Sequence, residues 1–190
     1  MLYSNILHIK TRKELRNWLQ ENSAQEKECW IAVKRGKPVD DGTLYYLDAV
    51  EEALCFGWID STVRKIGNTA MQRFSPRRKK SPWTELNKER ARRLEKIGLM
   101  TDAGRAVLPQ MDIQEFKIDD EIVNTLQQSE TWDTFNKFPP LYQRIRAYNI
   151  TFAKKRAPEA YKKALAHLIE ETRKGRMYGE WNDYGRLLDY

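Results

Sequence analysis

Residues 58–75, WIDSTVRKIGNTAMQRFS, contain the pattern that decides the fold class. Residues 58–66 and 70–75 are typical of strands, and the Gly67-Asn68 pair between them is typical of a tight β-hairpin turn. Residues 28–35 alternate in the same strand-like way and end before Gly36. We therefore predict an antiparallel sheet of about three strands, formed by residues 28–35, 58–66 and 70–75.

Helical patterns flank these strands. Thr11 and Glu14 have the spacing of a capping box in front of an amphipathic segment over residues 12–22. A second helix is expected between Leu47 and Leu54, and a third between Thr84 and Ile97. All later segments also show helical spacing, up to an aromatic tail that is expected to fold back onto the body of the protein.

This order of elements predicts an α+β protein. A core domain over residues 1–110 is expected to hold a small antiparallel sheet with helices packed on it. Residues 111–190 are expected to form a C-terminal helical region packed on that core. A chain of 190 residues is long enough for one such core and a smaller appendage.

The composition excludes several classes of protein. No apolar run approaches the length of a membrane-spanning helix, and residues 1–10 lack the features of a signal peptide. The two cysteines, Cys29 and Cys55, provide no disulfide framework and are interpreted as small buried hydrophobic residues. We therefore expect a cytoplasmic protein without a membrane span.

Positive charge is concentrated in one segment of the chain. Residues 62–96 contain twelve Lys or Arg and three Glu, a net charge of +9, whereas the whole chain has +7. A focused positive field favours an anionic partner. The alternative interpretation is an ordinary solvated basic surface.

One face of the predicted third helix mixes polar and apolar residues. Trp83, Asn87, Arg90, Leu94 and Ile97 follow at helical spacing, and the last two predict that this face is packed. A buried arginine requires an acid or an anionic ligand. We therefore expect Arg90 to be largely buried and to contact either a ligand or the nearest acid, Asp60.

The second strand of the hairpin predicts an anion site. Arg73, Ser75 and Arg77 share one face of an extended strand, with Phe74 turned inward. Two guanidinium groups and a hydroxyl suit a phosphate or a carboxylate. The predicted ligand-binding set is Trp58, Asp60, Arg73, Arg77, Trp83, Asn87 and Arg90. In the alternative interpretation the aromatic residues are core and residues 77–80 are a solvated loop.

Sequence signatures of enzymes are absent. The chain has no phosphate-binding glycine loop, no dinucleotide-binding glycine pattern and no His/Cys cluster with metal-ligand spacing. Its two histidines, His8 and His167, lie in no catalytic motif. We therefore expect no metal and no cofactor, and we favour a binding protein over an enzyme.

The stretch AVEEALCFGWID, residues 49–60, is similar to the YdeI/OmpD-associated family of bacterial proteins. The similarity continues through RFSPR at residues 73–77, through Trp83, Asn87 and Arg90, and through GLMTDAG at residues 98–104. The resemblance implies a role connected with bacteriocin protection and envelope stress, and it implies no catalytic residues. Tyr45 departs from the family pattern, which tends to place Ser or Thr at this helix start.

Three functions follow from these patterns. The first is a cytoplasmic accessory protein that binds an anionic small molecule in a pocket lined by Trp and Arg. The second is an enzyme acting on a small phosphorylated or carboxylated substrate, with Asp60 as acid or base. The third is non-specific binding of nucleic acid by residues 62–96. The oligomeric state stays open.

Overall fold

The chain folds into two compact units. The computed structural model describes residues 3–79, 81–154 and 156–190. Unit 1 comprises residues 1–82 and 90–110, and unit 2 comprises residues 83–89 and 111–190. The division therefore falls at residue 110, where the sequence places it, and also inside helix α3 (Glu85–Lys96).

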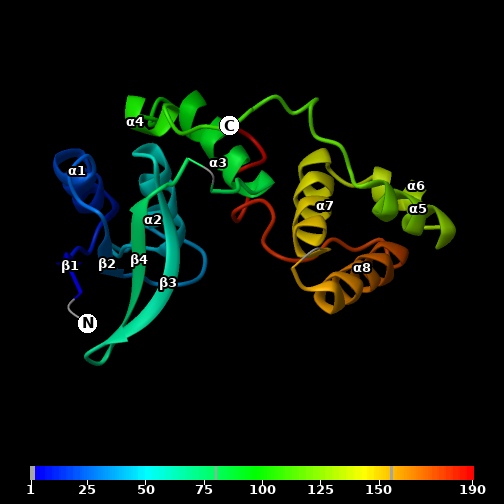
Figure 1. The fold of residues 1–190 in the computed structure, drawn as a ribbon, viewed down its shortest axis with the longest axis horizontal. Coiled ribbons are helices and arrows are strands. Elements are labelled where there is room, and N and C mark those ends of the chain that lie inside the picture. The colour runs from blue at the N-terminus through cyan, green and yellow to red at the C-terminus, as the bar shows by residue number, and fades with distance from the viewer. Residues whose placement is uncertain (1–2, 80, 155) are drawn as a thin grey trace. The chain divides into compact units, whose positions relative to one another are not determined.

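The predicted α+β class is confirmed, and the sheet of unit 1 has four strands rather than three (Figure 1). They are β1 (Ile6–Leu7), β2 (Cys29–Ala32), β3 (Trp58–Ile66) and β4 (Thr69–Pro76), in the spatial order β1-β2-β4-β3. The sheet is mixed because β1 pairs in parallel with β2, while the other pairs are antiparallel. A strand of two residues is too short to leave a periodic pattern in the sequence.

The β3–β4 hairpin forms as predicted. Ile66 pairs with Thr69, so Gly67 and Asn68 make the two-residue turn, and Gly67 has the positive φ of 58° that such a turn requires. β2 pairs with residues 71–74 of β4, so the distal part of the hairpin extends beyond β2 (Figure 1). A β-bulge interrupts β3 between Asp60 and Val63.

Helices α1 (Arg12–Asn22) and α2 (Tyr46–Cys55) cover one face of the sheet. The predicted capping box of α1 is present, because Thr11 and Glu14 exchange side-chain-to-backbone hydrogen bonds. α2 is buried along almost its whole length and lies behind β3 and β4 in Figure 1. α4 (Asp102–Arg105) follows α3 and begins at Thr101, whose hydroxyl accepts a bond from the Gly104 N–H.

Unit 2 is helical apart from its loops and its tail. It contains α5 (Asp120–Gln128), α6 (Trp132–Asn136), α7 (Pro140–Lys154) and α8 (Pro158–Arg173). Its core is centred on Tyr142, which is fully buried, and the tail residues Trp181 and Leu187 belong to the same cluster. The aromatic tail therefore folds back, as predicted. Within the described residues no helix is long and apolar enough to cross a membrane.

Candidate functional site

The two faces of the sheet carry different sets of the predicted residues. Directly opposed residues of an antiparallel pair share a face, and consecutive residues alternate. Arg73 is paired with Trp30, whereas Phe74 is paired with Asp60 and Pro76 with Trp58. We call the face with Trp30 and Arg73 the outer face, and the face with Trp58, Asp60 and Phe74 the inner face. The sequence-based expectation that Arg73 shares a pocket with Trp58 and Asp60 is therefore wrong.

The outer face holds a cavity of about 490 Å³, which we call the outer pocket. It combines residues of the N-terminus, the start of β2, the bulge of β3 and the middle of β4. The lining residues are Tyr3, Glu28, Trp30, Ser61, Thr62, Arg64 and Arg73. Of the seven predicted ligand-binding residues only Arg73 lines this pocket; the indole is that of Trp30, and the second guanidinium group is that of Arg64.

Arg73 is the centre of the hydrogen bonds in the outer pocket. Its Nε donates to Glu28 Oε2 at 2.6 Å, and its Nη1 donates to the hydroxyls of Ser61 at 3.2 Å and Ser75 at 3.4 Å. Arg73 and Ser75 therefore share a face, as predicted, while Phe74 is buried on the other face. Nearly a third of the Arg73 side chain, 31%, is exposed, so the guanidinium group is accessible to a ligand.

Glu28 accepts three side-chain hydrogen bonds. Besides Arg73, the donors are the indole Nε1 of Trp30 at 3.1 Å and the hydroxyl of Ser4 at 3.2 Å. The bond from Arg73 is the main reason that the pKa of Glu28 lies below its usual value, followed by the bond from Trp30. Glu28 is therefore ionised at neutral pH. It precedes β2 by one residue and was not predicted as a site residue.

Trp58 is a core residue of the inner face. Its side chain is buried, its Nε1 donates to the carbonyl of Ser23 at 3.2 Å, and its ring meets Trp18 edge to face at 5.8 Å. An indole that is buried and already hydrogen-bonded contributes to packing. The predicted role of Trp58 as the wall of a ligand pocket is therefore replaced by a role in holding α1 against the sheet.

Asp60 forms a close pair with Tyr46 at the start of α2. The Tyr46 hydroxyl donates to Asp60 Oδ2 at 2.6 Å, and the Arg35 guanidinium lies 3.8 Å above the Tyr46 ring. Burial and the charge of Asp60 raise the pKa of Tyr46 to about 12, while the charges of Arg90 and Arg35 act in the opposite direction. Arg90 therefore lies within electrostatic reach of the Tyr46–Asp60 pair, and its side chain is of intermediate burial.

Gln72 fixes the backbone beside this pair. Its buried side-chain amide donates to the carbonyls of Ser61 and Thr62 in the bulge at 3.3 and 3.4 Å. Its carbonyl oxygen accepts a bond from Arg35 Nη2 at 2.8 Å. Bulges often orient side chains next to functional sites. The sequence gives one indication of this role for Gln72: it is a polar residue two positions before the inward-facing Phe74, and therefore on the same buried face of the strand.

Arg77, Trp83 and Asn87 are not among the residues that line the outer pocket. β4 ends at Pro76, so strand alternation no longer orients Arg77. Its side chain is buried, and its Nη1 donates to the carbonyl of Pro82 at 3.0 Å. Trp83 and Asn87 belong to unit 2, and their approach to residues of unit 1 stays a prediction. Lys80, part of the alternative solvated loop, lies outside the described residues.

The packed face predicted for α3 is shorter than expected. Leu94 is fully buried, whereas Ile97 is 43% exposed. The reason is that α3 ends at Lys96, and Gly98 follows with a positive φ of 73°. Ile97 therefore lies beyond the last helical turn and does not mark the packed side. The Thr84 cap is present, because its hydroxyl accepts a bond from the Asn87 N–H at 3.1 Å.

A buried ionic network joins α1, α2 and α3 within unit 1, and the sequence reasoning missed it. Its acids lie on α2 and its arginines on α1 and α3. Its members are Asp48, Glu51, Glu52, Arg12, Arg16 and Arg93, with nitrogen–oxygen distances of 2.6–3.3 Å. The available signal was three acids at i, i+3 and i+4 within an apolar helix. Buried charges without partners are strongly disfavoured, so they predict arginines nearby.

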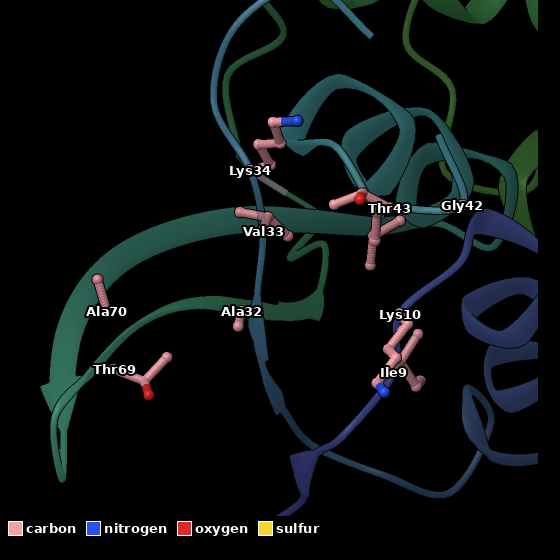
Figure 2. A pocket seen from close by; sticks show the side chains of 10 residues that line it. Ile9, Lys10, Ala32, Val33, Lys34, Gly42, Thr43, Thr69 and Ala70 are labelled. Carbon is pink, nitrogen blue, oxygen red and sulfur yellow. The ribbon is translucent and has the colours of Figure 1, made fainter. Parts of the chain in front are cut away.

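A second cavity, of about 440 Å³, holds none of the predicted residues (Figure 2). Side chains of residues 9–10, 32–34, 42–44 and 69–70 surround it. Lys34 contributes a positive charge there, but its Nζ forms an ion pair with Asp41 at 2.9 Å. Lys10 also lines this cavity, but the cavity contains neither an arginine nor a tryptophan, whereas the outer pocket contains both.

In the described part of the chain, the thiols form no nucleophilic site and the acidic side chains form no metal site. Cys29 and Cys55 are both buried, as predicted, and burial raises the pKa of each thiol to about 12. They are therefore not nucleophiles at neutral pH. Among the residues that the structure describes, no three His, Cys, Asp or Glu side chains are grouped to hold a metal ion.

Comparison with known proteins gives one match. The family described as "Domain of unknown function (DUF8412)" matches residues 7–107. These residues cover the sheet except for Ile6, helices α1 to α4, and the outer pocket except for Tyr3. No curated protein and no solved structure matches the chain. The resemblance to the YdeI/OmpD-associated family stays a prediction.

Proposed function

Since this chain belongs to the family of Domain of unknown function (DUF8412), we propose a function from its own residues: it binds a small anionic ligand in the outer pocket. The observation that supports the proposal is the exposed edge of Arg73 beside Trp30 in a cavity of about 490 Å³. The resemblance to the YdeI/OmpD-associated family supports a cytoplasmic accessory role in bacteriocin protection or envelope stress.

The chemistry of the outer pocket suits a phosphate or carboxylate group. Arg73 presents a planar set of donors, and Arg64 adds a second positive charge. The hydroxyls of Ser61 and Thr62 add neutral donors on the same wall. Trp30 is buried and its ring meets Tyr3 edge to face at 5.0 Å, so the partly exposed Tyr3 gives the pocket most of its apolar side for the body of a ligand.

Replacing Arg73 with Ala is expected to weaken binding of inorganic phosphate about 10- to 100-fold, because a hydrogen bond to a charged group contributes roughly 1.5–3 kcal/mol. Isothermal titration calorimetry of the wild type and the variant measures this loss. Arg105→Ala is the matched control, since it removes the same charge from an exposed pair with Glu95. Equal phosphate affinity of the wild type and Arg73→Ala contradicts the proposal.

The same proteins separate small-anion binding from nucleic-acid binding. A protein that binds oligonucleotides through residues 62–96 shows steep salt dependence and little preference among sequences. If the chain binds oligonucleotides but not inorganic phosphate, and Arg73→Ala leaves that binding unchanged, the basic segment acts as a non-specific nucleic-acid surface.

A second candidate function rests on the Tyr46–Asp60 pair of the inner face. A carboxylate and a phenol 2.6 Å apart, with the guanidinium of Arg35 at 3.8 Å from the phenol ring, supply an acid, a base and a positive charge. Such a group is able to transfer a proton to or from an anionic substrate. This arrangement supports the enzyme alternative, with Asp60 as the base.

If the wild type turns over any member of a panel of small phosphorylated and carboxylated compounds, Asp60→Asn is expected to reduce that turnover by about 10²–10⁴-fold. The carboxamide keeps the shape of Asp60 and removes its basicity. Tyr46→Phe is the paired variant, and Arg73→Ala is the control on the other face. Turnover that persists in Asp60→Asn at the rate of the wild type excludes this role.

A further inference from the structure

We infer that Glu28 is an internal competitor in the outer pocket: it lowers the affinity for every anion, so that the pocket is occupied by a dianion, which binds more strongly than a monocarboxylate. The inference rests on the proposed function, since it concerns the ligand class of the same pocket. Glu28 occupies the position in which a ligand carboxylate would bind. A ligand must therefore displace the Glu28 carboxylate by binding the same donors more strongly than Glu28 does.

Three donors from separate segments converge on the Glu28 carboxylate. They are Arg73 Nε of β4 at 2.6 Å, Trp30 Nε1 of β2 at 3.1 Å and the Ser4 hydroxyl of the N-terminal segment at 3.2 Å. A guanidinium group, an indole N–H and a hydroxyl form a set of donors suited to an external carboxylate or phosphate. The pocket is therefore already organised for an oxyanion, and a side chain of the same protein fills it.

Glu28 is able to leave this position without unfolding the sheet. Its side chain is 22% exposed and precedes β2, which begins at Cys29. Its main-chain carbonyl is held separately, by the side-chain amide of Asn5 at 3.1 Å. Rotation of the Glu28 side chain would free the three donors while the backbone stays in place. Because Glu28 is ionised at neutral pH, it competes with ligands throughout the physiological range.

Competition by Glu28 sets a threshold of affinity that a ligand must exceed, and a ligand with more charge exceeds it more readily. A tethered carboxylate acts at a high effective concentration, of the order of millimolar for a short flexible tether. A free monocarboxylate would exchange one carboxylate for another on the same donors and gain no new interaction. A dianion, such as a phosphate monoester or a dicarboxylate, would bind Arg73 and also interact with Arg64, which lines the same pocket. The ligand class is therefore a small dianion.

The test compares the wild type with Glu28→Gln in titrations with inorganic phosphate and with acetate, by calorimetry at pH 7.5. The amide keeps the size of Glu28 and removes its charge. In the wild type, a ligand binds only the fraction of molecules in which Glu28 has left the donors. If that fraction is about a tenth or less, removing the Glu28 charge raises the apparent affinity for both anions about tenfold or more. The wild type is expected to bind phosphate and to show no measurable binding of acetate.

Glu26→Gln is the matched control. It removes the same charge from the same segment, where Glu26 accepts a bond from Asn5 Nδ2 at 2.6 Å and does not line the pocket. A gain of affinity in Glu28→Gln but not in Glu26→Gln supports the inference. Equal gains in both variants indicate a general effect of charge and overturn it.

The remaining outcomes separate the inference from the proposed function. If the wild type binds phosphate and Glu28→Gln binds both anions no better, Glu28 is not a competitor, and the proposed function stands. If Glu28→Gln binds phosphate more weakly, Glu28 positions Arg73 instead, and the inference again fails. If neither protein binds phosphate or acetate, the proposed function fails together with the inference.

Discussion

Replacing Glu51 with Ala is expected to lower the free energy of unfolding by about 3–5 kcal/mol, the usual cost of removing one partner from a buried ion pair. Glu51 is fully buried, and its two carboxylate oxygens lie 2.7 Å from Arg12 Nη1 and 2.9 Å from Arg93 Nη1. Arg12 and Arg93 would each lose a partner at a carboxylate that is itself fully buried. Urea denaturation followed by circular dichroism measures the loss.

The control for this prediction is an exposed ion pair. Glu95 lies 2.9 Å from Arg105, and both side chains are more than 40% exposed. Glu95→Ala is expected to change the free energy of unfolding by less than about 1 kcal/mol, because solvent screens an exposed pair. If Glu51→Ala is no more destabilising than Glu95→Ala, the buried network does not hold α1, α2 and α3 together.

Replacing Trp58 with Ala is expected to destabilise the protein by about 3–5 kcal/mol, as for other buried tryptophans cut back to alanine. The substitution removes a buried indole, its contact with Trp18 and its hydrogen bond to the Ser23 carbonyl. Trp58→Phe keeps much of the ring volume and is expected to lose less. Thermal and urea melts of both variants measure the two losses.

The same variants decide whether Trp58 acts in packing or in binding. At a temperature where Trp58→Phe is folded, its phosphate affinity is expected to match that of the wild type, since Trp58 lies on the face opposite the outer pocket. Unchanged stability together with a loss of phosphate binding would restore the ligand role that the sequence predicts. Loss of stability with unchanged binding supports packing.

Local features of the fold were predictable because their causes lie within a few residues. The α1 capping box depends on Thr11 and Glu14 alone. The hairpin depends on Gly67-Asn68, since glycine tolerates the positive φ of the turn. The burial of both cysteines was also predictable, because a free Cys without a reactive setting is usually a small core residue.

Features of the sheet that depend on distant partners were not predictable. β1 has two residues and exists because residues 6 and 7 pair with β2, which is more than twenty residues away. The predicted strand over residues 28–35 is shorter than expected, because regular pairing ends at Ala32 and Lys34 forms an isolated bridge with Tyr45. The hydrophobic periodicity of a segment reflects its own residues and does not show which distant segment will pair with it.

The sequence by itself determined the α+β class, the hairpin, the helix starts and the presence of an arginine-rich strand with aromatic neighbours. Only the tertiary structure decided which aromatic ring accompanies Arg73. Alternation along β4 places Arg73 and Phe74 on opposite faces of the sheet. The register of the neighbouring strands then places Trp30 beside Arg73 and Asp60 beside Phe74. Register depends on how separate strands meet, and a change of one residue would exchange the two faces.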